Sequence, residues 1–157
     1  MAFCSPLYSD HGWQPVWLAF TAFGVALIAA RLLCGHLPDK FGGARIALLL
    51  VVVQAAGLLH IGLARNGMLA SAGAALAGFG YSLVYPGFGV EAVRNNSPET
   101  RGLIMGIDTV FLDIAMAVGS PASGWIADLE GLNAVFSASA GVTLLAAAVA
   151  LRLLRPR

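Results

Sequence analysis

Charged side chains are scarce in this chain. Lys, Arg, Asp and Glu make up 11% of its 157 residues, whereas hydrophobic residues make up 59%. This is the reverse of the balance that keeps the surface of a globular domain hydrated, so it argues against a soluble protein. The nine basic and eight acidic residues leave a net charge of +1, which gives no reason to expect nucleic acid as a partner.

Histidine and cysteine are also rare, with three and two residues. No cluster of His, Cys or carboxylate residues has the spacing of metal ligands. No Gly-rich loop follows a strand in the manner of a phosphate-binding loop, and no Ser-His-Asp set can be assembled. The sequence therefore predicts no metal, no cofactor and no enzymatic activity.

Long uncharged stretches are what the chain has instead. A helix needs roughly 20 apolar residues to cross a bilayer core of about 30 Å. Five stretches reach this length, and they predict an all-α integral membrane protein with a short external segment at residues 1–12. The predicted spans lie near residues 14–34, 45–64, 67–89, 102–127 and 132–154.

The basic residues predict the orientation, because Lys and Arg are retained on the cytoplasmic side of a membrane. In a five-span topology, Arg65 alone falls on one side and the other basic residues fall on the opposite side. That second group is Arg31, Lys40, Arg45, Arg94, Arg101, Arg152, Arg155 and Arg157. The C-terminus is therefore predicted to be cytoplasmic and the N-terminus external.

A charged turn connects the first two spans. It contains Gly35, Asp39, Gly42 and Arg45, and Arg31 precedes it. The glycines allow tight helix ends, and the Asp39 carboxylate can cap a helix or pair with a base. From these residues alone, an ordinary cytoplasmic turn is an equally good interpretation.

Two further motifs follow the turn. The first is Gly78-Phe79-Gly80 with a later Pro86, followed by Pro98-Glu99-Thr100-Arg101-Gly102, and the second is Gly119-Ser120-Pro121 with Gly124. In this order, the three motifs resemble the major facilitator superfamily of secondary transporters over roughly residues 13–155. The nearest likeness is to poorly characterised bacterial members of the sugar- or drug-efflux type.

The resemblance implies that the chain supplies helices eight to twelve of a twelve-helix transporter. Residues 1–12 would then be a remnant of helix seven, and the six-helix N-terminal half is missing. In this family the substrate binds near the membrane midplane between two halves that rock against each other. The resemblance also implies that Asp39 closes a cytoplasmic gate against the other half, with Glu91, Arg94 and Arg101 in the same charge network.

Asp113 is the first candidate for the transport pathway. It follows Gly102 by eleven residues and so lies roughly 16 Å into its helix. A carboxylate near the midplane costs about 2.5–3.5 kcal/mol on insertion scales, which favours a wet or paired setting. Asp113 could couple protons or contact the substrate, or it could form a structural pair with a neighbouring helix. Asp108 is about 140° away around the helix and is the weaker candidate.

Tyr81, Tyr85 and Phe88 form an aromatic stripe at helical spacing. The stripe could pack against a neighbouring helix or stack on a ligand. Gln54, near the middle of its span, could contact the substrate or bond a neighbouring helix. Tyr81, Tyr85 and Gln54 are therefore further candidates for the pathway.

These observations predict the C-terminal half of a transporter in a bacterial inner membrane. It would move a small solute, such as a sugar, a drug-like compound or a metabolite, by proton-coupled alternating access. Its partners would be that solute, protons, the lipid bilayer and either the missing N-terminal half or another membrane chain. The alternative is a truncated fragment or scaffold subunit that does not transport.

Overall fold

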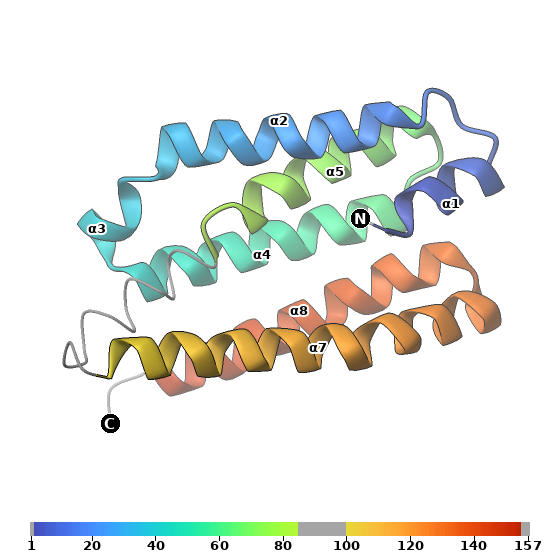
Figure 1. Cartoon of the computed structure of the whole chain (residues 1–157). Coiled ribbons are helices and arrows are strands. Elements are labelled where there is room, and N and C mark those ends of the chain that lie inside the picture. The colour runs from blue at the N-terminus through green and yellow to red at the C-terminus, as the bar shows by residue number, and fades with distance from the viewer. Residues whose placement is uncertain (1, 85–99, 155–157) are drawn as a thin grey trace.

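A computed structural model describes residues 2–84 and 100–154 of the chain, and these residues form helices joined by short turns, without a strand. The predicted all-α class is thereby confirmed. In chain order, the helices are α1 (Cys4–Asp10), α2 (Trp17–Cys34), α3 (Leu37–Phe41), α4 (Gly43–Gly62), α5 (Gly67–Tyr81), α7 (Arg101–Glu130) and α8 (Leu132–Leu154). The long helices run side by side along one axis (Figure 1).

Four of these helices, α2, α4, α7 and α8, are long and apolar enough to cross a bilayer. The span predicted at residues 67–89 starts with α5, which is 15 residues long, and its last five residues lie outside the described part of the chain. α7 is 30 residues long and continues through Pro121. A proline is tolerated inside a membrane helix because neighbouring groups can satisfy the freed backbone carbonyl.

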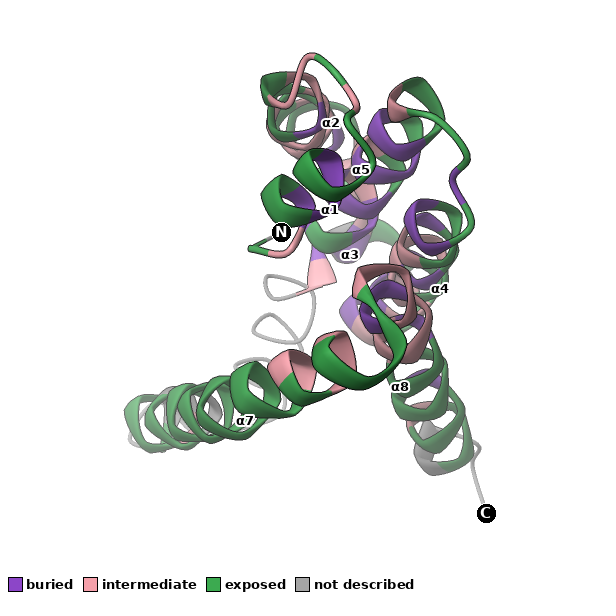
Figure 2. Cartoon of the chain, turned by 90° about the vertical axis from the view of Figure 1, so that its right-hand side faces the viewer, coloured by how far each residue is buried: buried purple, intermediate pink, exposed green. Residues whose placement is uncertain are grey.

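The core of the fold is the layer formed by α2, α5 and α4, with α5 in the middle (Figures 1 and 2). Glycine allows α4 and α5 to touch backbone to backbone. A Cβ atom added at Gly57 would lie 2.8 Å from the carbonyl oxygen of Gly73, and one added at Gly80 would lie 2.6 Å from the carbonyl oxygen of Leu50. Small residues hold membrane helices together because they permit this close approach.

The N-terminal helix α1 is docked against the bundle. Its residues Cys4, Leu7 and Tyr8 are at most 1% exposed. The Tyr8 hydroxyl donates a hydrogen bond of 2.6 Å to the carbonyl oxygen of Gly67 and lies 2.7 Å from the hydroxyl of Ser71. Burial raises the pKa of the Cys4 thiol. The short helix is thus fixed to the start of α5.

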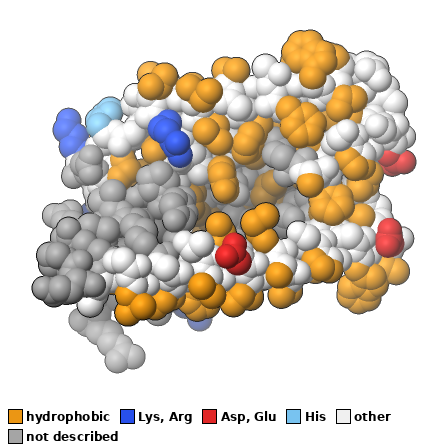
Figure 3. All heavy atoms as spheres, in the orientation of Figure 1, with side chains coloured by type: hydrophobic (Ala, Val, Ile, Leu, Met, Phe, Trp, Pro, Cys, Tyr) orange, Lys and Arg blue, Asp and Glu red, His pale blue; other side chains and the backbone are white. Residues whose placement is uncertain are grey.

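α7, unlike α1, is not docked against the bundle through buried side chains in the described residues. It packs mainly against α8, and none of its described side chains is buried. Figure 2 shows α7 as an exposed arm that extends away from the α2–α5–α4 layer. Between α2 and α7 the molecule presents an open face with many hydrophobic side chains (Figure 3).

Candidate functional site

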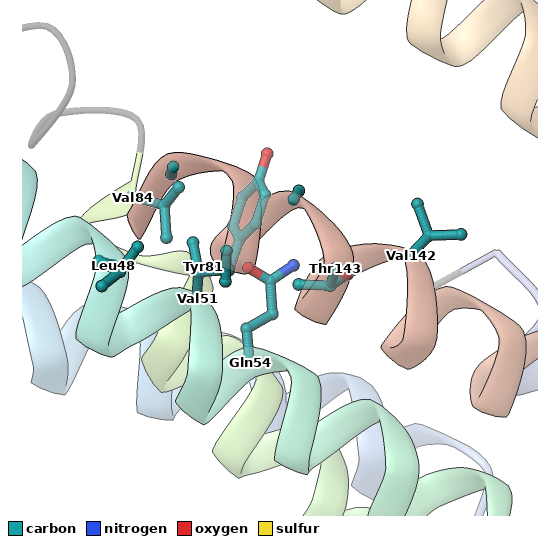
Figure 4. Close-up of a pocket in the computed structure, with 10 residues that line it drawn as sticks. Leu48, Val51, Gln54, Tyr81, Val84, Val142 and Thr143 are labelled. Atoms are coloured by element: carbon teal, nitrogen blue, oxygen red, sulfur yellow. The ribbon is translucent and has the colours of Figure 1, made fainter. Parts of the chain in front are cut away.

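A cavity of about 370 Å³ lies where α4, α5 and α8 meet (Figure 4). Among the described residues that line it, three have polar side chains: Gln54 from α4, Tyr81 from α5 and Thr143 from α8. The remaining lining is aliphatic and consists of Leu48, Val51, Val84, Val142, Ala146, Ala147 and Ala150. We call this cavity the α4–α5–α8 groove.

Gln54 and Tyr81, both predicted from the sequence as pathway residues, meet in this groove. Figure 4 shows the Gln54 amide and the Tyr81 ring extending from their helices into the same space. The Tyr81 ring also lies 6.3 Å from the ring of Phe23, centroid to centroid, and 51% of the residue is exposed. Packing against Phe23 therefore leaves part of the phenol available to a ligand.

The sequence did not reveal Thr143. Its hydroxyl donates a hydrogen bond of 2.7 Å to the carbonyl oxygen of Ser139, one turn earlier in α8. The only signal available was a hydroxyl within a run of Leu, Ala and Val residues. Such hydroxyls are common in membrane helices because they can bond to their own backbone, so the signal does not mark a site.

Asp113 lies elsewhere, on α7, which contributes none of the described residues that line the groove. The Asp113 side chain is exposed, and it makes no hydrogen bond or ion pair with any residue that the structure describes. Ser120, two turns further along α7, lines a second cavity of about 270 Å³ that also includes Ser123 and Ser139. The structure thus leaves the Asp113 carboxylate on the uncovered helix.

Several predicted site residues lie wholly or partly outside the described part of the chain. Tyr85, Glu91 and Arg94 lie outside the described residues. Three more residues have a described backbone but no described side chain: Asp39, Arg101 and Asp108.

The glycines of the charged turn lie at helix ends. Gly42 precedes the first residue of α4 with φ at 92°, a conformation that strongly favours glycine. Gly35 ends α2, and its N–H donates a hydrogen bond of 3.0 Å to the carbonyl oxygen of Arg31. The short helix α3 lies between these two glycines, and Arg45 is exposed in the first turn of α4.

Arg31 links the charged turn to the end of α5. Its Nη2 atom donates a hydrogen bond of 3.4 Å to the carbonyl oxygen of Ser82. The Ser82 hydroxyl in turn donates a hydrogen bond of 2.8 Å to the carbonyl oxygen of Leu27. A cation near the last carbonyls of a helix is favourable because those carbonyls carry partial negative charge. Together the two bonds tie α2 to α5 at one end of the bundle.

Most of the described basic residues lie at one end of the structure (Figure 3), whereas Arg65, which follows α4, lies at the other end. Arg31, Lys40 and Arg45 lie at the end where α2 stops and α4 starts. The acidic residues at the other end, where α1 and α7 stop, are Asp10, Asp128 and Glu130. The excess of Lys and Arg at one end has the form of the asymmetry that orients membrane proteins.

The sequence family described as the Major Facilitator Superfamily matches residues 5–157. The chain belongs to this superfamily. The resemblance inferred from the three motifs is thereby confirmed. Membership, together with the four long apolar helices, makes the chain part of a multi-pass membrane protein.

Similar proteins in this superfamily are longer. An uncharacterized MFS-type transporter of Salmonella typhimurium is 38% identical over 154 residues, which cover 98% of this chain and 40% of that protein. One from Pseudomonas aeruginosa is 39% identical over 158 residues, which cover 98% of this chain and 39% of that protein. The chain therefore spans about two fifths of the length of these major facilitator relatives.

Proposed function

We propose that this chain is the C-terminal half of a secondary transporter that moves a small solute by proton-coupled alternating access. The match to the Major Facilitator Superfamily over residues 5–157 carries this proposal. The α4–α5–α8 groove supports it, because it brings together polar side chains from three helices in a volume suited to a small molecule. The relatives' greater length supports the role of a half, with another six-helix unit as its partner.

Asp113 is the proposed proton-coupling carboxylate. A charge at the middle of a membrane helix is costly when it faces lipid. The exposed face of α7 must therefore meet a second protein surface in a working transporter, and the N-terminal half would provide it. Protonation would neutralise the Asp113 carboxylate. The free-energy cost of moving this face of α7 from a water-exposed state to a buried one would then be lower.

The basic end of the bundle is the proposed cytoplasmic end, in a bacterial inner membrane. In this orientation the charged turn, with Asp39 as its gate residue, faces the cytoplasm together with the C-terminus. The Arg31–Ser82 hydrogen bond supports a structural role for this end, since it links α2 to α5 beside the turn. Movement of the turn would thereby be transmitted to α5, which contributes Tyr81 to the groove.

The test is proton flux in liposomes that contain a pH-sensitive dye. The 157-residue chain is reconstituted alone and together with the N-terminal half of the Pseudomonas aeruginosa relative, and a pH gradient is imposed. We expect flux only when both halves are present. Absence of flux in both conditions, with correct insertion shown by protease protection, would contradict the proposal.

A non-transporting fragment or scaffold subunit is the second candidate. The observation in its favour is α7, which has no buried side chain in the described structure and packs mainly against α8. Such a chain would insert into the membrane and show no flux with the N-terminal half. The same reconstitution therefore separates the two candidates.

A further inference from the structure

The α4–α5–α8 groove has a distinct chemistry. None of the ten described residues that line it carries a charge. The Thr143 hydroxyl already donates a hydrogen bond to Ser139. The Gln54 amide and the Tyr81 hydroxyl, in contrast, make no hydrogen bond with any residue in the described ranges. An unpaired polar group away from water costs about 1–3 kcal/mol, so these two groups are the ones that a ligand would satisfy.

We infer that the groove binds a compact, uncharged and largely apolar solute that presents one or two hydrogen-bonding groups to Gln54 and Tyr81. Aromatic ketones, amides and phenols belong to this class. The inference rests on the proposed function, because it names the class of solute that the transporter carries. The volume of about 370 Å³ lies within the range of small-molecule sites.

Sugars and ions fit this groove poorly. A monosaccharide carries several hydroxyl groups, and two free partners would leave most of them unsatisfied. An ion would lose its hydration without gaining an opposite charge, since no described residue of the lining is charged. The aliphatic lining instead favours a ligand whose surface is mostly apolar.

A lipid acyl chain is the competing occupant, and it differs from the proposed solute in one respect. An acyl chain makes no hydrogen bond, so its binding does not depend on the Gln54 amide or the Tyr81 hydroxyl. The two polar groups point into the groove from different helices (Figure 4). Removing either group therefore distinguishes a hydrogen-bonded solute from lipid.

The experiment uses the full chain in phosphatidylcholine nanodiscs and benzophenone as the photoreactive probe. Benzophenone is uncharged and apolar apart from one carbonyl oxygen, which can accept hydrogen bonds from both Gln54 and Tyr81. We expect saturable labelling of peptides that include residues 48–54, 81–84 and 142–150. Excess acetophenone should compete, whereas glucose and benzoate should not.

Gln54→Leu and Tyr81→Phe should each weaken the saturable labelling about three- to tenfold, the loss expected for one hydrogen bond. Thr21→Val is the matched control, because Thr21 is exposed on α2, which contributes none of the described residues that line the groove. It should leave labelling unchanged. Labelling that does not saturate, or that is equal in all three variants, would overturn the inference in favour of lipid-like partitioning.

Competition identifies the other ways in which the inference can fail. Displacement of benzophenone by glucose would show a site for polar solutes, and displacement by benzoate as effective as that by acetophenone would show a site that accepts charge. Labelling as expected without proton flux would overturn the proposed transport and leave the binding class intact. Flux without saturable labelling would overturn the binding class alone.

Discussion

The α4–α5 pair and α7 are both apolar helical regions, yet α4 and α5 pack closely against each other whereas α7 is largely exposed. α4 and α5 touch through glycines whose Cβ positions are occupied by the opposing backbone. α7 also contains glycines, among them Gly106 and Gly119, but neither would bring a Cβ atom within 4 Å of a neighbour. Apolar composition alone therefore does not show where a helix packs, because the same residues suit a helix interface and an exposed face.

The largest expected loss of stability comes from adding a methyl group to the interface between α4 and α5. Gly80→Ala would push a Cβ atom against the backbone of Gln54 and Leu50. We expect it to lower the free energy of unfolding by about 1–3 kcal/mol, the usual cost of overpacking. Unfolding by sodium dodecyl sulfate in mild detergent, followed by circular dichroism, measures this change.

Gly119→Ala in α7 is the control for that comparison. It has open space around it, and alanine favours a helix over glycine by up to about 1 kcal/mol. We expect the free energy of unfolding of this variant to equal that of the unsubstituted chain or to be slightly higher. A loss as large as that of Gly80→Ala would show that α7 is packed in detergent.

The second prediction concerns the exposed carboxylate. Asp113→Asn should reduce proton flux at least tenfold in the chain reconstituted with an N-terminal half, because the amide cannot be protonated and released. Asp128→Asn, near the end of the same helix and also exposed, should leave the flux unchanged. Equal flux in both variants would contradict the coupling role of Asp113.

The third prediction compares two tyrosines. Tyr8→Phe removes the hydrogen bond to Gly67 and should cost about 0.5–1.5 kcal/mol of stability. Tyr81→Phe should cost less than that, since its hydroxyl has no hydrogen-bond partner among the described residues. The unfolding assay in detergent measures both. Equal costs would mean that the α1 anchor is weaker than its geometry indicates.

The smallest change in the free energy of unfolding is expected from substitution of Arg31. Its hydrogen bond to Ser82 is 3.4 Å long, and the side chain is exposed. Arg31→Gln should therefore change the free energy of unfolding by less than about 1 kcal/mol. Arg45→Gln, with an exposed side chain at the same end of the bundle, provides the baseline for loss of charge alone. A larger loss at Arg31 would show that its bond stabilises the junction of α2 and α5.

Much of the fold followed from the sequence. The long uncharged stretches predicted helices, and the order of the three motifs identified the superfamily. Two side chains of the groove were candidates from the sequence, Gln54 as a polar residue near the middle of its span and Tyr81 as part of an aromatic stripe, and their role in a transport pathway stays a prediction. Thr143 was not predicted to line the groove. Its position there depends on the rotation of α8 relative to α4 and α5, which a run of Leu and Ala residues does not define.

The sequence by itself determined that this chain forms membrane helices, because hydropathy and length are properties of one continuous segment and need no neighbour. Tertiary structure alone decided which side chains meet. It placed Gln54 beside Tyr81, docked α1 through Tyr8, and left α7 without a buried side chain in the described residues. The reason is that contacts between helices depend on their rotation and spacing, and here backbone approach at glycine sets both.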